Sequence, residues 1–105
     1  MFRHVVIWNL ADRFTQEEKE STALEIKARL EAFARELPGV TYFRVYTGGL
    51  PSSTGDLILD SSFDTYEALE HYKSHPTHVK IGEFVRSVVK SRAVMDYKAD
   101  LAFWE

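Results

Sequence analysis

The segment Phe2–Leu10 limits how this chain can fold more than any other, because it is apolar on two sides. Its β-branched and aromatic residues predict a strand, in which successive side chains point to opposite faces. One face carries Phe2, His4, Val6, Trp8 and Leu10, and the other carries Val5 and Ile7. A single layer of helices covers only one face of a sheet. A second layer of protein is therefore expected on the other face.

Composition narrows the class of protein. The chain has 105 residues, of which 45% are hydrophobic and 28% charged, as is typical of one globular domain. Its net charge is −3 and no basic patch is visible, so we expect no nucleic-acid partner. Cysteine is absent, which excludes thiol nucleophiles, disulfides and cysteine zinc sites and agrees with a reducing compartment.

Membrane and export signals are not visible in the sequence. No apolar run approaches the ~18 residues that a membrane-spanning helix needs. No small-residue cleavage site follows the first apolar segment, so we expect no signal peptide. The expectation is a cytoplasmic protein without a membrane partner.

The first helix has a defined start and a defined end. Thr15-Gln16-Glu17-Glu18 has the pattern of a capping box, and Pro38-Gly39 is typical of a helix stop. Between them, apolar residues recur at intervals of three and four, which places them along one helical stripe. This stripe consists of Ala23, Ile26, Leu30, Phe33 and Leu37.

Two strands and a short helix follow. Residues 40–46 and 57–63 are rich in strand-forming types and are separated by a loop rich in glycine and serine. Asp64 is expected to cap the next helix. That helix should stop near His75, because Pro76 disfavours helical backbone in the residue before it.

Proline suits the first turn of a helix, so a further helix is expected to begin at Pro76. Its apolar stripe consists of His78, Ile81, Val85 and Val88. Residues 91–98 predict the last strand, with Ala93, Met95 and Tyr97 on one face and Arg92, Val94 and Asp96 on the other.

The order strand, helix, strand, strand, helix, strand (βαββαβ) is typical of the ferredoxin-like α+β fold. This fold has a four-stranded antiparallel sheet with its helices on one face. A homodimer in which two such sheets pack face to face explains why the first strand is apolar on both sides. We expect residues 1–98 to form the domain and residues 99–105 to form a tail, whose Phe103 and Trp104 add to the interface.

The segment His75-Pro76-Thr77-His78-Val79 resembles the His-Pro-x-His signature of the stress-responsive A/B barrel family. Three further segments match that family, namely His4-Val5-Val6, Leu37-Pro38-Gly39-Val40 and Phe63–Leu69. The resemblance extends over residues 1 to about 98. It implies a dimeric α+β barrel made of two ferredoxin-like chains, in agreement with the two-sided first strand.

The resemblance also implies a site. Some plant members of the family are stable oligomers induced by stress, and one is a polyketide cyclase that closes an aromatic ring by intramolecular aldol condensation. Its catalytic Tyr and His, together with an assisting His on the first strand, correspond to Tyr72, His78 and His4. A further pocket His of that cyclase corresponds to Leu57, so the pocket wall differs.

These residue types suit aldol chemistry. The reaction needs a base for an acidic α-proton, and histidine titrates near neutral pH. It also needs a donor for the enolate oxygen, such as a tyrosine hydroxyl. The predicted faces bring His4, Tyr72 and His78 into one space between helices and sheet. We expect the remaining wall of this pocket to consist of Val6, Trp8, Leu57, Leu59, Ile81, Val94 and Asp96. The expected ligand is a small apolar molecule that contains a carbonyl group.

Purely structural roles explain the same residues. A buried histidine is usually hydrogen-bonded to a backbone carbonyl or to a tyrosine. His4, Tyr72 and His78 therefore also suit a polar cluster that serves only packing. The protein is then a non-catalytic, stress-related oligomer, and the sequence leaves the choice between enzyme and non-enzyme open.

Two other pairs of charged or titratable residues suggest a metal site and an ion pair, respectively. His71 and His75 are four residues apart, a spacing that can hold a metal, but Pro76 breaks the helix and no acidic residue follows closely. We therefore expect neither a metal nor a cofactor. Arg92 and Asp96 share the strand face that looks toward the helices, where we favour an ion pair over a role for Asp96 in orienting a histidine.

Overall fold

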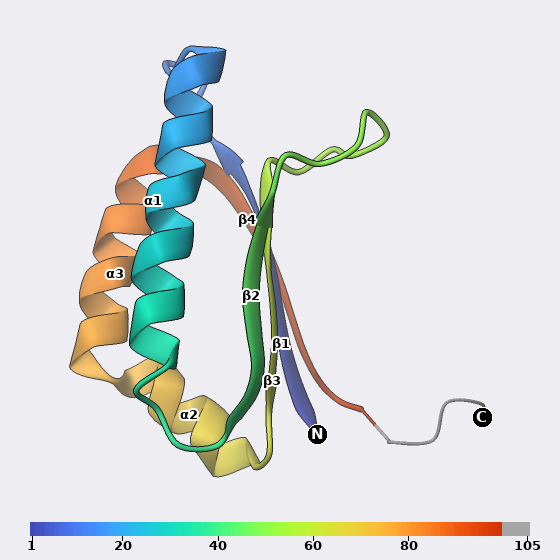
Figure 1. Cartoon of the computed structure of the whole chain (residues 1–105), viewed down its shortest axis with the longest axis vertical. Coiled ribbons are helices and arrows are strands. Elements are labelled where there is room, and N and C mark those ends of the chain that lie inside the picture. Colours follow the sequence, from blue (N-terminus) through green and yellow to red (C-terminus); the bar gives the residue numbers. More distant parts are fainter. Residues whose placement is uncertain (100–105) are drawn as a thin grey trace.

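The computed structural model describes residues 1–99, so the predicted contribution of Phe103 and Trp104 lies outside the described residues. The four strands form one antiparallel sheet in the order β2-β3-β1-β4 (Figure 1). The elements, in chain order, are β1 (Phe2–Leu10), α1 (Gln16–Ala34), β2 (Val40–Thr47), β3 (Leu57–Phe63), α2 (Tyr66–Ser74), α3 (Pro76–Val88) and β4 (Val89–Lys98). This order and pairing confirm the predicted ferredoxin-like α+β fold.

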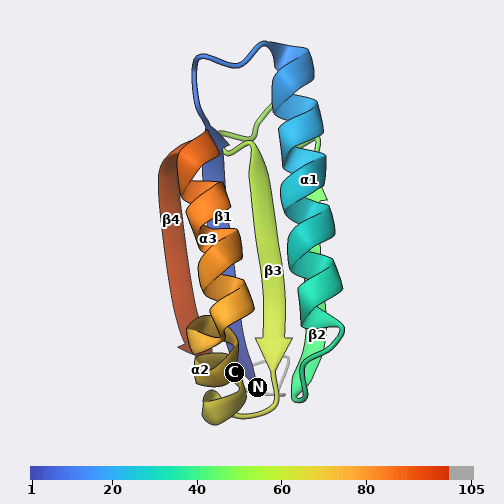
Figure 2. The same ribbon diagram turned by 90° about the vertical axis from the view of Figure 1, so that its left-hand side faces the viewer.

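The helices form a single layer on one face of the sheet. Figure 2 shows α1 and α3 side by side over the strands, with α2 at the end of the sheet where the chain also begins. Their apolar stripes bury Ala23, Ile26, Leu30, Phe33, Leu69, Tyr72, Ile81, Val85 and Val88. None of the helices in residues 1–99 is long and apolar enough to cross a membrane.

Strand register decides which side chains meet that layer. Residues paired across antiparallel strands point to the same face of the sheet. His4 pairs with Ser61 and Asp96, and Val6 pairs with Leu59 and Val94. Alternate residues of β1 therefore face the helices, and the central ones are buried, which agrees with the predicted alternation.

The helix starts differ in one detail from the prediction. Thr15 and Glu18 form the predicted capping box, with the Glu18 amide donating to Thr15 Oγ1 at 3.1 Å and the Thr15 amide to Glu18 Oε1 at 2.8 Å. The predicted cap Asp64 is wrong, because Thr65 occupies the N-cap and accepts from the Ala68 amide at 3.0 Å. The Asp64 amide instead donates to the Gly39 carbonyl at 2.9 Å, which ties it to the preceding turn.

The ends of two elements also differ from the prediction. Helix α1 ends at Ala34, where tight turns carry the chain toward Pro38, so Ala34 is buried and the predicted stripe residue Leu37 is only half-buried. Strand β4 begins at Val89, two residues before the predicted start at Ser91, because α3 passes into it without a loop.

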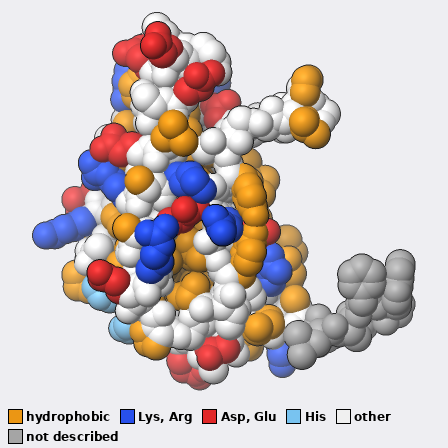
Figure 3. Space-filling view, viewed as in Figure 1, with side chains coloured by type: hydrophobic (Ala, Val, Ile, Leu, Met, Phe, Trp, Pro, Cys, Tyr) orange, Lys and Arg blue, Asp and Glu red, His pale blue; other side chains and the backbone are white. Residues whose placement is uncertain are grey.

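The face of the sheet away from the helices is apolar and uncovered in the single chain. We call it the outer face, and it includes Arg3, Val5, Ile7, Tyr42, Arg44, Tyr46, Ile58, Asp60, Ala93, Met95 and Tyr97. Ile7 is 40% exposed and Met95 66% exposed. Figure 3 shows hydrophobic side chains along this side of the molecule and at the tip of the β2–β3 loop, which projects past the sheet.

Candidate functional site

A cavity of about 340 Å³ lies between α3 and the sheet. We call it the helix-side cavity. Its wall consists of His4, Val6, Trp8, Leu30, Leu59, Tyr72, His78, Ile81, Gly82, Val85, Arg86, Val89 and Arg92. Three other hollows on the described part of the chain have no histidine on their walls. The helix-side cavity thus combines an apolar floor with two imidazoles and a phenol.

The chain brings these polar groups together through two local features. Alternation along β1 points His4, Val6 and Trp8 to the same face, so the floor of the cavity carries one imidazole beside apolar side chains. The break between α2 and α3 at Pro76 turns the chain sharply. As a result, Tyr72 near the end of α2 and His78 in the first turn of α3 have their ring centroids 4.4 Å apart.

His78 is held in one tautomer. Its Nδ1 lies 3.0 Å from the Lys73 carbonyl oxygen, which can only accept, so Nδ1 carries the proton and Nε2 carries the lone pair. Burial lowers the pKa of His78, and the nearby charges of Arg92 and Arg86 lower it further. His78 is therefore neutral at neutral pH, with an unprotonated nitrogen available to accept a proton.

His4 has the same protonation pattern with a different partner. Its Nδ1 lies 2.5 Å from Asp96 Oδ1, while Lys73 Nζ lies 2.5 Å from Asp96 Oδ2. Burial lowers the pKa of His4, although the Asp96 carboxylate opposes that shift. Since the carboxylate accepts the Nδ1 proton, Nε2 of His4 is also left as an acceptor.

The favoured pairing of Arg92 with Asp96 is therefore wrong. Register places Arg92 opposite Trp8 and Asp96 opposite His4, so the two strand residues sit at different levels of the sheet. The long side chain of Lys73 reaches Asp96 from α2 instead. Asp96 takes the role of a residue that orients a histidine.

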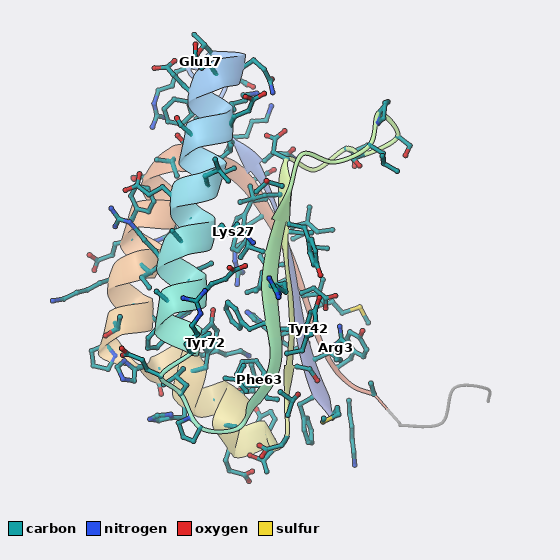
Figure 4. All side chains as sticks on the ribbon, in the orientation of Figure 1. Arg3, Glu17, Lys27, Tyr42, Phe63 and Tyr72 are labelled. Atoms are coloured by element: carbon teal, nitrogen blue, oxygen red, sulfur yellow. The ribbon has the colours of Figure 1, made fainter. Side chains whose placement is uncertain are left out.

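Tyr72 is enclosed by rings and is only 1% exposed. The centroids of Phe33, Phe43 and Phe63 lie 5.4–5.8 Å from its own, and that of His4 lies 5.8 Å away. Figure 4 shows Tyr72 in the space between the helices and the sheet, on the opposite side of the sheet from Arg3 and Tyr42. Burial raises the pKa of Tyr72 well above its usual range, so the phenol keeps its proton.

The three polar groups do not satisfy one another. Among residues 1–99, each histidine uses Nδ1 on a group outside the trio, and no hydrogen bond involves the Tyr72 hydroxyl. His78 makes the backbone bond that a structural role predicts. Within the described part of the chain, the remaining acceptors of His4 and His78 and the hydroxyl of Tyr72 have no protein partner, as a ligand site requires.

The structure places most of the predicted pocket residues on one wall. His4, Tyr72, His78, Val6, Trp8, Leu59 and Ile81 all line the helix-side cavity. Leu57, Val94 and Asp96 do not, which corrects the prediction for these three. Leu57 packs in the core beyond the cavity, whereas Val94 is 46% exposed because β4 is an edge strand beyond the cover of the helices.

Sequence reasoning missed six wall residues, namely Leu30, Gly82, Val85, Arg86, Val89 and Arg92. The helical periodicity already grouped Leu30 and Val85 with the core, and alternation placed Arg92 on the helix-facing side of the last strand. No sequence signal pointed to Gly82 or Arg86, because their place depends on how α3 packs against β4. His71 and His75, the pair weighed for a metal, lie outside the wall, and residues 1–99 hold no group of three side chains arranged as metal ligands.

Comparisons with known proteins agree with this fold. A family model described as the stress responsive A/B barrel domain matches residues 2–99. No curated protein matches the sequence significantly. A dimeric protein of unknown function with a ferredoxin-like fold from Bacteroides fragilis has a TM-score of 0.83 and 28% identity, covering 93% of this chain and 95% of its own.

Two more distant solved structures share the fold. A hydroxynitrile lyase from Passiflora edulis has a TM-score of 0.78 and 14% identity, over 97% of this chain and 95% of the lyase. A putative antibiotic biosynthesis monooxygenase from Deinococcus radiodurans has a TM-score of 0.76 and 13% identity, over 99% of this chain and 96% of that one. A protein described as a lyase and one described as a putative monooxygenase thus share this fold.

Proposed function

The chain belongs to the stress responsive A/B barrel domain family, and from this premise we propose that it is a homodimer whose helix-side cavities bind and transform a small apolar carbonyl compound. The reaction class is enolisation followed by carbon–carbon bond formation or cleavage, as in an aldol cyclase or a related lyase. His78 is the proposed base, Tyr72 the hydrogen-bond donor to the enolate oxygen, and His4 a polarising group.

One observation carries this proposal. A cavity of about 340 Å³ is lined by His4, Tyr72 and His78 and otherwise mostly by apolar side chains. Pockets for small ligands have volumes of roughly 300–1,000 Å³ and place a few polar groups among apolar walls. A polar cluster that served only packing would fill this space.

The protonation states of the site residues support the assigned roles. Nε2 of neutral His78 takes the α-proton of the ketone, and the electron pair of the C–H bond forms the enolate. The Tyr72 hydroxyl donates a hydrogen bond to the enolate oxygen, and its raised pKa keeps the proton on the phenol. The enolate carbon then attacks a second carbonyl carbon, and protonated His78 returns the proton to the new alkoxide.

The outer face supports the homodimer. Apolar residues such as Ile7, Met95 and Tyr46 are too exposed in a lone chain, and large apolar patches on soluble proteins mark interfaces. The similar Bacteroides fragilis protein is described as dimeric. The β2–β3 loop projects on this side (Figure 1) and would contact the second copy, with Leu50 76% exposed in the turn closed by the hydrogen bond from the Ser53 amide to the Leu50 carbonyl.

Deuterium exchange at the α-carbon of a ketone tests the chemistry directly. We expect the protein to accelerate exchange of the α-protons of 4-phenylbutan-2-one in D2O, followed by proton NMR. H78A should abolish the acceleration, and Y72F should lower it by about 10²-fold or more, the usual contribution of one such group. H71A is the matched control, because His71 is exposed and outside the cavity wall.

Two results would count against this function. If H78A accelerates α-proton exchange of the ketone as much as the unmodified protein does, His78 is not the base. A second contrary result is that neither the unmodified protein nor any variant exchanges the α-protons faster than buffer alone, while H78A mainly lowers the melting temperature. The polar groups then serve packing, and the stress-related, non-catalytic oligomer is the better account.

A further inference from the structure

The wall of the helix-side cavity is unevenly charged. It includes two arginines, Arg86 of α3 and Arg92 of β4, and no Asp or Glu. Both arginines are exposed to solvent, whereas the histidines and Tyr72 lie deeper in the cavity. The charged groups are therefore at the mouth and the neutral polar groups at the base.

Each guanidinium is directed to this mouth by the element that carries it. Arg92 pairs with Trp8 in the sheet and so points to the helix side of edge strand β4. Arg86 follows Gly82 by one turn of α3, and a Cβ at Gly82 would lie 3.3 Å from Arg86 Nη1. The Arg86 guanidinium thus covers the backbone of Gly82, itself a wall residue.

Neither arginine is paired with a carboxylate within residues 1–99. By contrast, Arg3 binds Asp60 and Arg29 binds Glu25. Asp96, which shares the helix-facing side of β4 with Arg92, is already bound by His4 and Lys73. Among the described residues, these two permanent positive charges at the mouth of the cavity therefore have no acidic partner.

An anionic group is the ligand chemistry that fits this mouth. Arginine binds a carboxylate through charge-assisted, often bidentate hydrogen bonds, which are stronger than neutral ones. The apolar floor formed by residues such as Val6, Leu30 and Leu59 favours an aromatic or aliphatic body. The ketone end then lies at the base, beside His78 and Tyr72.

We propose that the ligand class of the helix-side cavity is a small keto acid, whose carboxylate is bound by Arg86 and Arg92 at the mouth and whose ketone reaches His78. This inference rests on the proposed function and narrows its substrate class from any apolar carbonyl compound to a monoanionic one.

A pair of probes that differ only in charge tests this inference. 3-Benzoylpropanoate and its neutral isostere 3-benzoylpropanamide are titrated into the full-length protein by isothermal titration calorimetry. We expect the carboxylate to bind at least about tenfold more tightly, as one charge-assisted hydrogen-bonding group implies. Added salt should weaken the carboxylate more than the amide.

Substitutions locate the charge that matters. In the double variant R86Q/R92Q, the ratio of the two affinities should fall toward one. K80Q removes one positive charge from the exposed side of α3, outside the cavity wall, and should leave the ratio as it is. A ratio that survives in R86Q/R92Q, or falls equally in K80Q, overturns the inference.

The failures of the two proposals are distinguishable. If both probes bind with equal affinity, the cavity remains a ligand site and only the preference for a keto acid is wrong. If neither probe binds, and 4-phenylbutan-2-one is not exchanged either, both the keto-acid inference and the proposed function are wrong.

Discussion

At the scale of single residues, His4 and His78 share one arrangement. Each ring donates its Nδ1 proton to an oxygen that can only accept, Asp96 Oδ1 in one case and the Lys73 carbonyl in the other. Lys73 takes part in both, because its side chain binds Asp96 while its backbone binds His78. One residue at the end of α2 therefore helps to orient both imidazoles.

The first prediction concerns Asp96. Its hydrogen bond and negative charge raise the pKa of His4 against the effect of burial, so D96N should lower that pKa further. The measurement is the pH titration of the His4 ring protons by NMR. D12N, which removes an exposed carboxylate bound to Lys90, is the control and should leave the His4 titration unchanged. A rise of the His4 pKa in D96N would contradict the assigned hydrogen bond.

The second prediction concerns the effect of pH on stability. Burial holds the pKa of both His4 and His78 below the ordinary value of 6.5. As the pH falls below 6.5, the unfolded chain binds protons at these residues before the folded protein does, so the free energy of unfolding decreases. Above 6.5 these histidines are neutral in both the folded and the unfolded chain, so this loss of stability is absent.

Urea unfolding at fixed protein concentration checks this sign. The free energy of unfolding should be lower at about pH 5.5 than at about pH 7.5, a range that lies above the titration of ordinary carboxylates. The decrease should be smaller in H78N and unchanged in H71N. An increase of stability toward the lower pH would show that the histidines are charged in the folded protein.

Part of this site was predictable from residues alone. Alternation along β1 and the stripe of α3 correctly directed His4 and His78 toward one interior space. The sequence raised Asp96 only as the less favoured partner of a histidine, because His4 and Asp96 are 92 residues apart and meet only through the register of β1 and β4. Sequence periodicity predicts on which face of a helix or strand a residue lies. Its hydrogen-bond partners depend in addition on strand register and on how the helices pack against the sheet.

At the scale of elements, α3 does most to shape the cavity. It supplies His78 from its first turn and Arg86 from its last, and Gly82 between them leaves room for the mouth. Glycine in the interior of a helix is unfavourable by about 1 kcal/mol relative to alanine. The presence of Gly82 on the cavity wall is explained if a ligand needs the space that a larger side chain would fill.

The third prediction follows from these two opposing effects of Gly82, on helix stability and on the room at the cavity mouth. G82A should raise the free energy of unfolding by up to about 1 kcal/mol, because alanine is the better helix former. The added Cβ would crowd the Arg86 guanidinium, so the affinity for 3-benzoylpropanoate should decrease. G82L should weaken binding more, since its side chain enters the mouth.

Thermal unfolding and calorimetry on the same samples separate these two effects. K80A is the matched control, because it places alanine on the same helix outside the cavity wall and should leave binding unchanged. Unaltered affinity in both G82A and G82L would mean that the ligand does not pass Gly82.

Element boundaries were predicted best where side-chain chemistry is local. The capping box at Thr15 and the helix break at Pro76 were read directly from neighbouring residues. Errors arose where tertiary contacts decide, as at Asp64, which the turn at Gly39 holds out of the cap position. The exposure of Val94 likewise follows from the place of β4 at the sheet edge, which alternation does not reveal.

At the scale of the whole molecule, the sheet separates two surfaces for which we propose different roles. The helix side holds the cavity, and the outer face is apolar without a cover in the single chain. A homodimer packed through the two outer faces would leave both helix-side cavities uncovered, because the helices lie on the opposite face of each sheet. Binding chemistry and dimer formation are therefore separable by substitution.

The fourth prediction uses that separation. I7E and M95E place charges in the centre of the proposed dimer interface and should weaken the dimer by about 100-fold or more, because a buried unpaired charge is unfavourable. Sedimentation velocity over a range of concentrations measures the shift toward monomer. L24E, at a residue of α1 that is 56% exposed, is the control and should remain dimeric. An unmodified protein that is monomeric at all concentrations would contradict the homodimer.

The most direct test of the account is where a ligand binds. A backbone NMR titration with 4-phenylbutan-2-one distinguishes the helix-side cavity from the hollow of about 380 Å³ on the outer-face side, lined by residues such as Ile7 and Tyr46. The account predicts that the largest shift changes fall on α3, at Ile81, Gly82 and Val85. Changes confined to Ile7, Tyr46 and the β2–β3 loop, or no changes at all, would contradict it.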